Sequence, residues 1–289
     1  MTGNLYVVAT PLGNLGDLSV RAIDTLRSVA LICAEDTRHS RRLCEQFGIP
    51  TPLVSLHDFN ERERLEGLLA RLTAGEDLAL ISDAGTPLIS DPGYRLVRAA
   101  RQARIPVYAI PGPSALTAAL SVAGIPTDRF VFEGFLPAQA PARRAHLATL
   151  AGETRTLVFY ESPHRLSACL TDMVDVFGAE REAAVVREIT KRFEEGRLET
   201  LGSLREWAAA GVRGECVVVV SGAVQGRGRD EEALRVLTLL LGELPLRQAV
   251  SLASHITGVS RKGLYAQALT LKGAVQTPEP HGSEESNEI

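Results

Sequence analysis

The sequence lacks the long apolar segments that would place it in or across a membrane. No stretch of its 289 residues reaches 18 consecutive apolar residues, so a membrane-spanning helix is excluded. The first residues, MTGNLYVVATPLG, contain no basic segment followed by a long apolar run. They predict a strand rather than a signal peptide.

Cysteine is scarce, and none of the four cysteines belongs to a Cys-x-x-Cys pair. This argues against a zinc cluster or a thioredoxin-like redox site. No group of His, Asp and Glu has the spacing of metal ligands either, so we expect no metal. Cys33 and Cys216 lie in apolar, strand-like segments and are predicted to be small core residues. A reduced, cytoplasmic setting fits this usage best.

Lysine is almost absent, with 28 arginines against Lys191, Lys262 and Lys272. The net charge of −4 comes from residues 273–289, which hold four glutamates and no Lys or Arg, and leaves the remaining chain neutral. Arginine suits an RNA partner because it contacts phosphate in two places and stacks on bases. A genome rich in G and C produces the same bias, and we take that to explain most of these arginines.

The familiar nucleotide-binding and hydrolase motifs are also missing. The first strand ends in a turn, Thr10–Asp17, that has neither the GxGxxG of a dinucleotide fold nor the GxxxxGK[ST] of a P-loop. No GxSxG sequence occurs. NAD, ATP and serine-hydrolase functions are therefore disfavoured.

Short apolar segments alternate with amphipathic ones over about the first 125 residues. This pattern predicts an α/β fold with a parallel sheet covered on both faces. The expected strands are Leu5–Thr10, Leu31–Glu35, Leu53–His57, Leu78–Asp83 and Pro106–Ile110, and the expected helices include Ser19–Ser28, Asn60–Thr73 and Gly93–Arg104. Ligands bind beyond the carboxyl ends of such strands.

A second α/β domain is predicted for residues 126–225, after a first domain of residues 1–125. Its expected strands are Phe130–Phe135, Thr156–Tyr160, Glu182–Ile189 and Glu215–Ser221, with helices Ala140–Leu150, Arg165–Phe177 and Ser203–Ala210. A linker, Gly226–Arg229, is expected to precede a helical segment over residues 230–272. Residues 273–289 are predicted to form a disordered acidic tail.

Two loops after successive strands of the first domain predict a single ligand crevice. Ser82–Tyr94 is long and contains two Gly and two Pro, and Pro111–Ala115 is built of small residues. Charged segments follow other strands: Glu35–Arg42, Tyr160–Arg165 and Arg187–Arg192. The first could bind substrate or be a capped helix start with solvated arginines. In the other two, Glu161 and Glu188 could be catalytic, although carboxylates at strand ends are more often one half of an ion pair.

A family resemblance rests on eight motifs that occur in order along the chain. They are LYVVATPLGNLGD, AEDTRHS, SDAGTPLISDPGY, PGPSA, FEGFLP, FYESPHR, REITK and GECVVVV. The chain resembles the tetrapyrrole-methylase-like, class III S-adenosylmethionine methyltransferases over residues 4–272. Within them it is most similar to the bacterial enzymes that methylate a cytidine ribose 2′-hydroxyl of 16S ribosomal RNA. The resemblance implies two α/β domains with S-adenosylmethionine between them, plus a C-terminal helical appendage. It also implies a homodimer acting on the small ribosomal subunit.

The resemblance also implies roles for particular residues. The expected cofactor-binding residues are Gly85, Thr86, Pro87, Ile89, Ser114, Ala115, Tyr160, Glu161, Gly214, Glu215 and Cys216. In the family's Gly-Asp-Pro motif the middle residue is Asp, and Thr86 replaces it here. The expected substrate contacts are Pro11, Asn14, Arg38, Arg165, Arg187, Arg261 and Lys262. Methyl transfer from a sulfonium needs alignment first and a proton acceptor late in the step; the candidate acceptors are Asp36, Glu161 and Glu188.

Residues Leu246–Leu269 predict two helices around Thr257–Ser260, a helix–turn–helix that could contact RNA through Arg261 and Lys262. Packing against the rest of the chain is the commoner use of such a hairpin. Two other functions stay open: methylation of a tetrapyrrole or a diphthamide intermediate by the same fold, and a non-enzymatic RNA-binding assembly factor.

Overall fold

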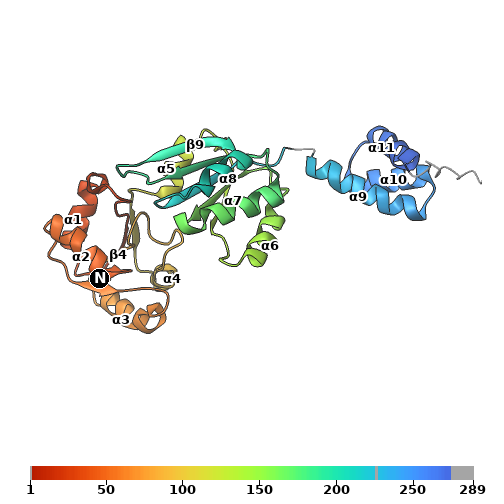
Figure 1. Ribbon diagram of the computed structural model, residues 1–289. Coiled ribbons are helices and arrows are strands. Elements are labelled where there is room, and N and C mark those ends of the chain that lie inside the picture. The colour runs from red at the N-terminus through yellow and green to blue at the C-terminus, as the bar shows by residue number, and fades with distance from the viewer. Residues whose placement is uncertain (1, 225–226, 275–289) are drawn as a thin grey trace, which may run out of the picture. The chain divides into compact units, whose positions relative to one another are not determined.

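The computed structural model describes residues 2–224 and 227–274. The chain forms two compact units, residues 1–222 and 223–289. The first unit contains two five-stranded sheets, and the second contains helices α9 to α11 (Figure 1). Among the described residues, no helix is long and apolar enough to cross a membrane.

The first sheet is entirely parallel, with strand order β3-β2-β4-β1-β5. Its strands are β1 (Leu5–Val8), β2 (Leu31–Ala34), β3 (Leu53–Ser55), β4 (Leu78–Ile81) and β5 (Val107–Ile110). The predicted parallel α/β sheet is therefore confirmed. Strands β1 to β4 end one or two residues earlier than predicted, because the residues that follow already belong to the loops, whereas β5 ends at Ile110 as predicted.

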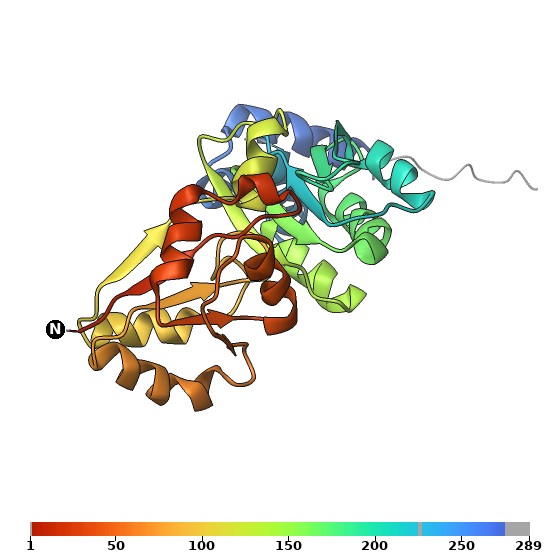
Figure 2. The same cartoon turned by 90° about the vertical axis from the view of Figure 1, so that its left-hand side faces the viewer.

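Helices cover both faces of this sheet (Figure 2). The helices are α1 (Val20–Ser28), α2 (Thr37–Gln46), α3 (Glu61–Thr73) and α4 (Tyr94–Gln102). Side chains of α1 and α2 pack with Ile32 and Ile81 in one apolar cluster. Those of α3 and α4 pack with Leu78 and Leu80 in another. Since both faces are buried, the strands are apolar throughout.

The second sheet is mixed, with order β6-β7-β10-β8-β9. Its strands are β6 (Phe130–Phe135), β7 (Thr156–Glu161), β8 (Glu182–Arg187), β9 (Glu195–Thr200) and β10 (Cys216–Val220). Only β6 and β7 are parallel. The sequence analysis missed β9, because this edge strand is mostly polar and its side chains are only partly covered.

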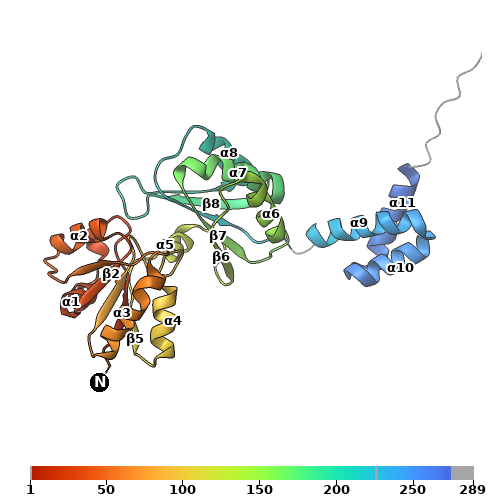
Figure 3. The ribbon, with the colours of Figure 1, turned by 90° about the horizontal axis from the view of Figure 1, so that it is seen from below.

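Helix α5 (Ala115–Val122) covers one face of the second sheet, where its Ala119 and Leu120 cluster with Val158 and Val217. Helices α6 (Ala140–Leu150), α7 (Pro163–Phe177) and α8 (Leu201–Ala209) cover the other face. Figure 3 shows the helices on this sheet from below. Because α5 follows β5 of the first sheet directly, the loop before α5 lies where the two sheets meet.

The second unit has its own core. Helices α9 (Arg227–Glu243), α10 (Leu246–Thr257) and α11 (Arg261–Ala274) bury Leu237, Val250 and Leu264 together. The two helices predicted around Thr257–Ser260 are confirmed. The expected linker is shorter than predicted, because α9 begins at Arg227. The disordered tail was predicted for residues 273–289, but α11 extends to Ala274, and residues 275–289 lie outside the described part.

Candidate active site

A cavity of about 410 Å³ opens where the two sheets of the first unit meet. From the first sheet it is lined by residues that follow β1, β2 and β4 and by the start of α5. From the second sheet it is lined by Phe135, by residues around the end of β7, and by the segment entering β10. The carboxyl ends of the parallel strands thus meet the second sheet at one concave site, as expected for an α/β fold.

The loop after β4 is the main wall of this cavity, and the backbone holds it tightly. Thr10 and Gly85 exchange two backbone hydrogen bonds of 2.8 and 3.0 Å. The Thr86 hydroxyl donates to the Pro113 carbonyl oxygen at 3.0 Å, which joins this loop to the one before α5. Leu88 and Ser90 adopt φ angles of 73° and 69°. Such left-handed backbone in non-glycine residues is costly and concentrates at functional sites.

Tyr160 connects the second sheet to the start of α5. Its hydroxyl accepts the Leu116 backbone N–H at 3.1 Å. The rings of Phe132 and Phe135 lie against it, with centroids 4.8 and 5.6 Å away. Burial raises the pKa of Tyr160, so its hydroxyl stays protonated at neutral pH. Tyr160 therefore presents an aromatic wall and a fixed polar tip to the cavity.

The cavity is strongly acidic. Its lining includes five carboxylate side chains and one ammonium group: Glu35, Asp83, Asp91, Glu161, Glu215 and Lys191. Burial, with help from the neighbouring Glu35 and Asp83 charges, raises the pKa of Asp91 to about 6 although a hydrogen bond with Ser82 lowers it. Burial and the Asp83 charge also raise the pKa of Glu35. Crowded, partly buried carboxylates of this kind favour a cationic ligand.

Lys191 is tied to carboxylates within the cavity region. Its ammonium nitrogen lies 3.0 Å from Glu188 Oε1 and 3.1 Å from Glu215 Oε2. These two pairs neutralise Lys191, so the remaining acidic groups of the cavity keep an excess of negative charge.

Glu161, at the end of β7, is almost fully buried. Its Oε1 accepts the Ser162 N–H at 2.8 Å and lies 3.3 Å from Arg165 Nε. Its Oε2 is buried without a hydrogen-bond partner. A buried carboxylate oxygen without a donor is costly, and Glu161 lines the cavity. Glu161 therefore brings a buried carboxylate with one unpaired oxygen to the wall of the cavity.

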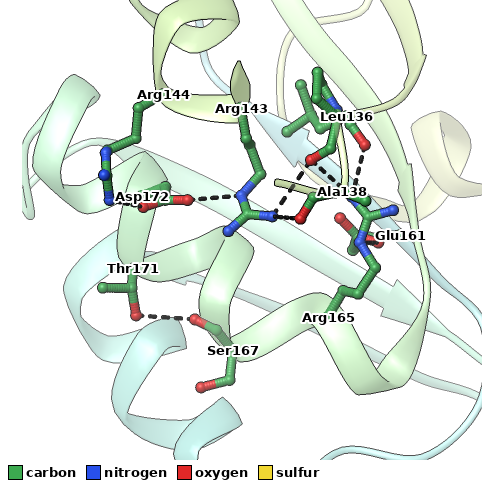
Figure 4. A network of polar contacts seen from close by, with 10 residues as sticks. Leu136, Ala138, Arg143, Arg144, Glu161, Arg165, Ser167, Thr171 and Asp172 are labelled. Atoms are coloured by element: carbon green, nitrogen blue, oxygen red, sulfur yellow. Dashed lines mark hydrogen bonds and ion pairs between the residues drawn. The ribbon is translucent and has the colours of Figure 1, made fainter. Parts of the chain in front are cut away.

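Arginines hold the wall behind Glu161 in place (Figure 4). Arg165 donates to the Leu136 carbonyl oxygen at 2.6 Å. Arg143 donates to the Ala138 carbonyl oxygen at 3.0 Å and forms a buried ion pair of 2.6 Å with Asp172. Arg144 reaches the other oxygen of Asp172 at 3.1 Å. These contacts fix the loop that follows Phe135, a residue of the cavity wall.

Most of the predicted cofactor residues meet at this cavity. Those that line it are Gly85, Thr86, Ile89, Ser114, Ala115, Tyr160, Glu161, Glu215 and Cys216. Two do not line it. Pro87 is buried beneath the loop. Gly214 has a φ of 85°, and a Cβ there would overlap the Glu188 side chain, so it shapes the turn before β10.

The three candidate proton acceptors lie in different surroundings. Glu161 lines the cavity, whereas Asp36 and Glu188 are not among the lining residues. Asp36 caps α2 by accepting the Arg38 N–H at 2.8 Å. Its ion pair with the Arg38 side chain lowers the pKa of Asp36 to about 2. Glu188 is paired with Lys191.

The predicted substrate residues of the first unit lie outside the cavity lining. Pro11 is buried, and Asn14 caps the short helix Leu15–Asp17. Arg38 is exposed but pairs with Asp36. Arg165 pairs with Glu161. Arg187 pairs with Glu195 at 2.6 Å. The other two, Arg261 and Lys262, begin α11 in the second unit.

Several cavity residues were not selected from the sequence, chief among them Glu35, Asp83 and Asp91. Glu35 and Asp83 follow β2 and β4 closely, so the rule that ligands bind at strand ends could have found them. Asp91 lies ten residues beyond β4, and only the folded loop brings it back to the cavity. Within the described residues, no group of three His, Cys, Asp or Glu is arranged to hold a metal ion.

Comparisons with known proteins agree with this arrangement. Residues 4–205 match the model of the Tetrapyrrole (Corrin/Porphyrin) Methylases, and residues 227–272 match that of the RsmI C-terminal HTH domain. A uroporphyrin-III-C-methyltransferase structure from Thermus thermophilus superimposes with a TM-score of 0.54 at 21% identity. It covers 76% of this chain and 94% of its own, and it shows the fold alone.

Closer relatives narrow the family further. Ribosomal RNA small subunit methyltransferase I of Pseudomonas aeruginosa is 56% identical, covering 94% of this chain and 98% of the relative. The protein of the same name from Xylella fastidiosa is 54% identical, covering 91% of this chain and 98% of the relative. The chain therefore belongs to the tetrapyrrole methylase family, and within it to the group of ribosomal RNA small subunit methyltransferase I.

Proposed function

We propose that this chain transfers a methyl group from S-adenosylmethionine to 16S ribosomal RNA of the small subunit, at the ribose 2′-hydroxyl of a cytidine. The observation that carries the proposal is 56% identity, over 94% of the chain, to a ribosomal RNA small subunit methyltransferase. The choice of a cytidine 2′-hydroxyl rests on the eight ordered motifs of the sequence. Because ribosomal RNA is made and modified in the cytoplasm, we place the protein there.

The cavity suits the proposed cofactor. S-adenosylmethionine carries a sulfonium and an ammonium group and supplies a methyl group already activated for transfer. Asp83, Asp91 and Glu35 offer negative charge to such a cation. Tyr160 and Ile89 supply apolar surface for a planar ring. Thr86 still belongs to the site although the family has Asp there, but its hydroxyl already donates to Pro113.

The chain's own residues contribute orientation and proton acceptance. Methyl transfer is fast when the attacking oxygen, the carbon and the leaving sulfur are held in line. The rigid loop around Leu88 and Ser90 and the wall at Tyr160 provide fixed surfaces for this. Glu161 is the best-supported proton acceptor, because of the three candidates it is the one that lines the cavity, and its Oε2 has no hydrogen-bond partner. Asp36 and Glu188 have less support, since neither lines the cavity and each is paired with a cation.

We further propose that the enzyme is a homodimer, on the basis of the family resemblance. Light scattering at micromolar concentration is expected to give a particle of twice the 31.1 kDa of one chain. A particle with the mass of one chain would overturn this part of the proposal.

The test of the activity offers three acceptors in parallel to the purified protein with methyl-labelled S-adenosylmethionine. They are intact small subunits from cells that lack the enzyme, a short RNA with the target loop, and a free tetrapyrrole. We expect label in the 16S RNA of intact subunits, much less in the short RNA, and resistance to alkaline cleavage at one cytidine. Label only in the tetrapyrrole would identify a different methylase. RNA binding without label would identify an assembly factor.

A further inference from the structure

Helices α10 and α11 carry positive charge without acidic residues between them. From residue 244 to 274 the sequence contains Arg247, Arg261, Lys262 and Lys272 and no Asp or Glu. Solubility alone does not account for an excess of one sign, because acidic residues would serve it as well.

Three of these cations surround one open concavity with a volume of about 370 Å³. We call this surface the basic concavity; α10 contributes Arg247, Val250 and Ser251, and α11 contributes Arg261, Lys262 and Tyr265. Tyr265 is 40% exposed, so part of its ring is accessible to a ligand. The surface thus combines cations at its margin with an aromatic ring and an apolar floor.

The cations of the basic concavity lack carboxylate partners. Among the residues that the structure describes, no ion pair involves Arg247, Arg261 or Lys262; Arg261 only approaches His255 Nε2, at 3.1 Å. By contrast Arg235, on α9 of the same unit, pairs with Glu232 at 2.7 Å. Clustered cations without counter-charges repel one another in the free protein. An anionic ligand would remove that repulsion.

We propose that the basic concavity binds a single-stranded segment of RNA, with phosphates at Arg247, Arg261 and Lys262 and a base stacked on Tyr265. The aromatic ring favours a single strand, because proteins read unpaired RNA by stacking exposed bases on such rings, whereas duplex bases are already stacked. The flexible cations fit a phosphate backbone, which presents one charge per nucleotide. The proposal rests on RNA being the substrate, but not on methyl transfer itself.

The experiment measures the affinity of the full chain for 16S RNA by filter binding between 50 and 300 mM salt. Arg247→Ala is expected to weaken binding by about fivefold and to flatten the salt dependence by about one ion. Tyr265→Leu retains apolar bulk and loses the aromatic face. It is expected to weaken binding by about fivefold or more with an unchanged salt dependence, because stacking releases no counterions. Tyr265→Phe should bind like the parent.

Arg235→Ala is the matched control, since it removes a cation of the same unit outside the basic concavity. Equal binding by Arg247→Ala, Tyr265→Leu and the control would overturn the proposal, as would equal loss in all three. Competition adds a second readout. Unlabelled single-stranded RNA should displace the 16S RNA better than a duplex of the same length, and equal displacement would overturn the stacking contact.

Cofactor binding and methylation of small subunits, measured on the same variants, separate this inference from the proposed function. If the parent binds RNA through the basic concavity but transfers no methyl group, the proposed function fails and the inference stands. If the parent methylates small subunits and both variants bind RNA normally, the inference fails and the proposed function stands.

Discussion

The cavity of the first unit and the basic concavity of the second unit carry opposite charge. The cavity of the first unit is lined by five carboxylates and one lysine, whereas the basic concavity of the second unit is lined by three cations and no acid. The cavity therefore complements a cationic ligand, and the basic concavity complements an anionic one.

Individual arginines of the two units differ in the same sense, although Arg235 of the second unit is paired with Glu232. In the first unit Arg143, Arg165 and Arg187 are bound to carboxylates, so they hold the fold together. In the second unit Arg247 and Arg261 are exposed and lack such partners among the described residues. An arginine-rich composition is thus a poor guide to RNA contacts unless the ion pairs are known.

The largest expected effect concerns the structural arginines. Arg143→Ala leaves Asp172 buried with only the half-exposed Arg144 as partner. Breaking a buried pair in this way should lower the free energy of unfolding by about 3–5 kcal/mol, measured by urea denaturation. Arg247→Ala should change it by less than about 0.5 kcal/mol. If both variants lost a similar free energy of unfolding, the distinction between structural arginines in the first unit and unpaired ones in the second would be wrong.

Blocking the acidic cavity should have the next largest effect. Ala115 lines the cavity at the start of α5, so Ala115→Trp should fill the space and reduce S-adenosylmethionine affinity more than about 100-fold by calorimetry, about 2.7 kcal/mol. RNA affinity should not change. Thr117→Trp, on the exposed side of the same helix, is the control. A folded Ala115→Trp protein that binds the cofactor normally would show that the site lies elsewhere.

Salt should distinguish the two surfaces without any substitution. Three phosphate contacts to single-stranded RNA imply a loss of about tenfold or more in RNA affinity between 50 and 200 mM salt. Cofactor affinity should fall less than about twofold, because charges in a partly enclosed cavity are screened less. Equal salt dependence of the two ligands would contradict the assignment of one surface to each.

The smallest expected effect is the pH dependence of cofactor binding through Asp91. Its pKa of about 6 is raised by burial, so its carboxylate is lost as the pH falls below 6, and S-adenosylmethionine affinity should fall about fivefold between pH 7.5 and 5. The Asp91→Asn variant should bind S-adenosylmethionine weakly at both pH values, so its affinity should no longer change between them. A step of the same size in Asp91→Asn would assign it to another group.

The same substitution should affect stability in the opposite direction. A raised carboxyl pKa means that the folded state prefers the protonated form, so the ionised carboxylate of Asp91 costs stability above pH 6 and this cost disappears as the pH falls. Asp91→Asn should therefore raise the Tm at pH 7.5 by about 1–3 °C. A lower Tm would show that the carboxylate has a structural role.

Local patterns predicted most of the fold. The strands of the first sheet were found because both faces are buried, and α6 has the predicted bounds, Ala140–Leu150. The polar edge strand Glu195–Thr200 was missed, since its partner β8 supplies the pairing that its own residues do not signal. The mixed order of the second sheet depends on contacts between distant segments, which no local pattern contains.

The site was predictable where loops carry small residues, as at Gly85 and Ala115. It was not predictable where function depends on pairing. Glu188 and Lys191 had the residue types of a catalytic or phosphate-binding group, but each neutralises the other. Asp91 belongs to the loop Ser82–Tyr94 that was predicted to form the crevice, but it was not singled out, because its distance from β4 along the chain conceals its position in the folded loop.

The thiol of Cys216 has a consequence for an enzyme that handles a reactive methyl donor. Cys216 lines the acidic cavity, and a thiolate there would itself be a good methyl acceptor. Burial raises the pKa of this thiol to about 12, and the thiol donates to the Gly214 carbonyl oxygen at 3.2 Å. The sulfur is therefore held in its protonated, poorly nucleophilic form, which protects the protein from alkylating its own cofactor site.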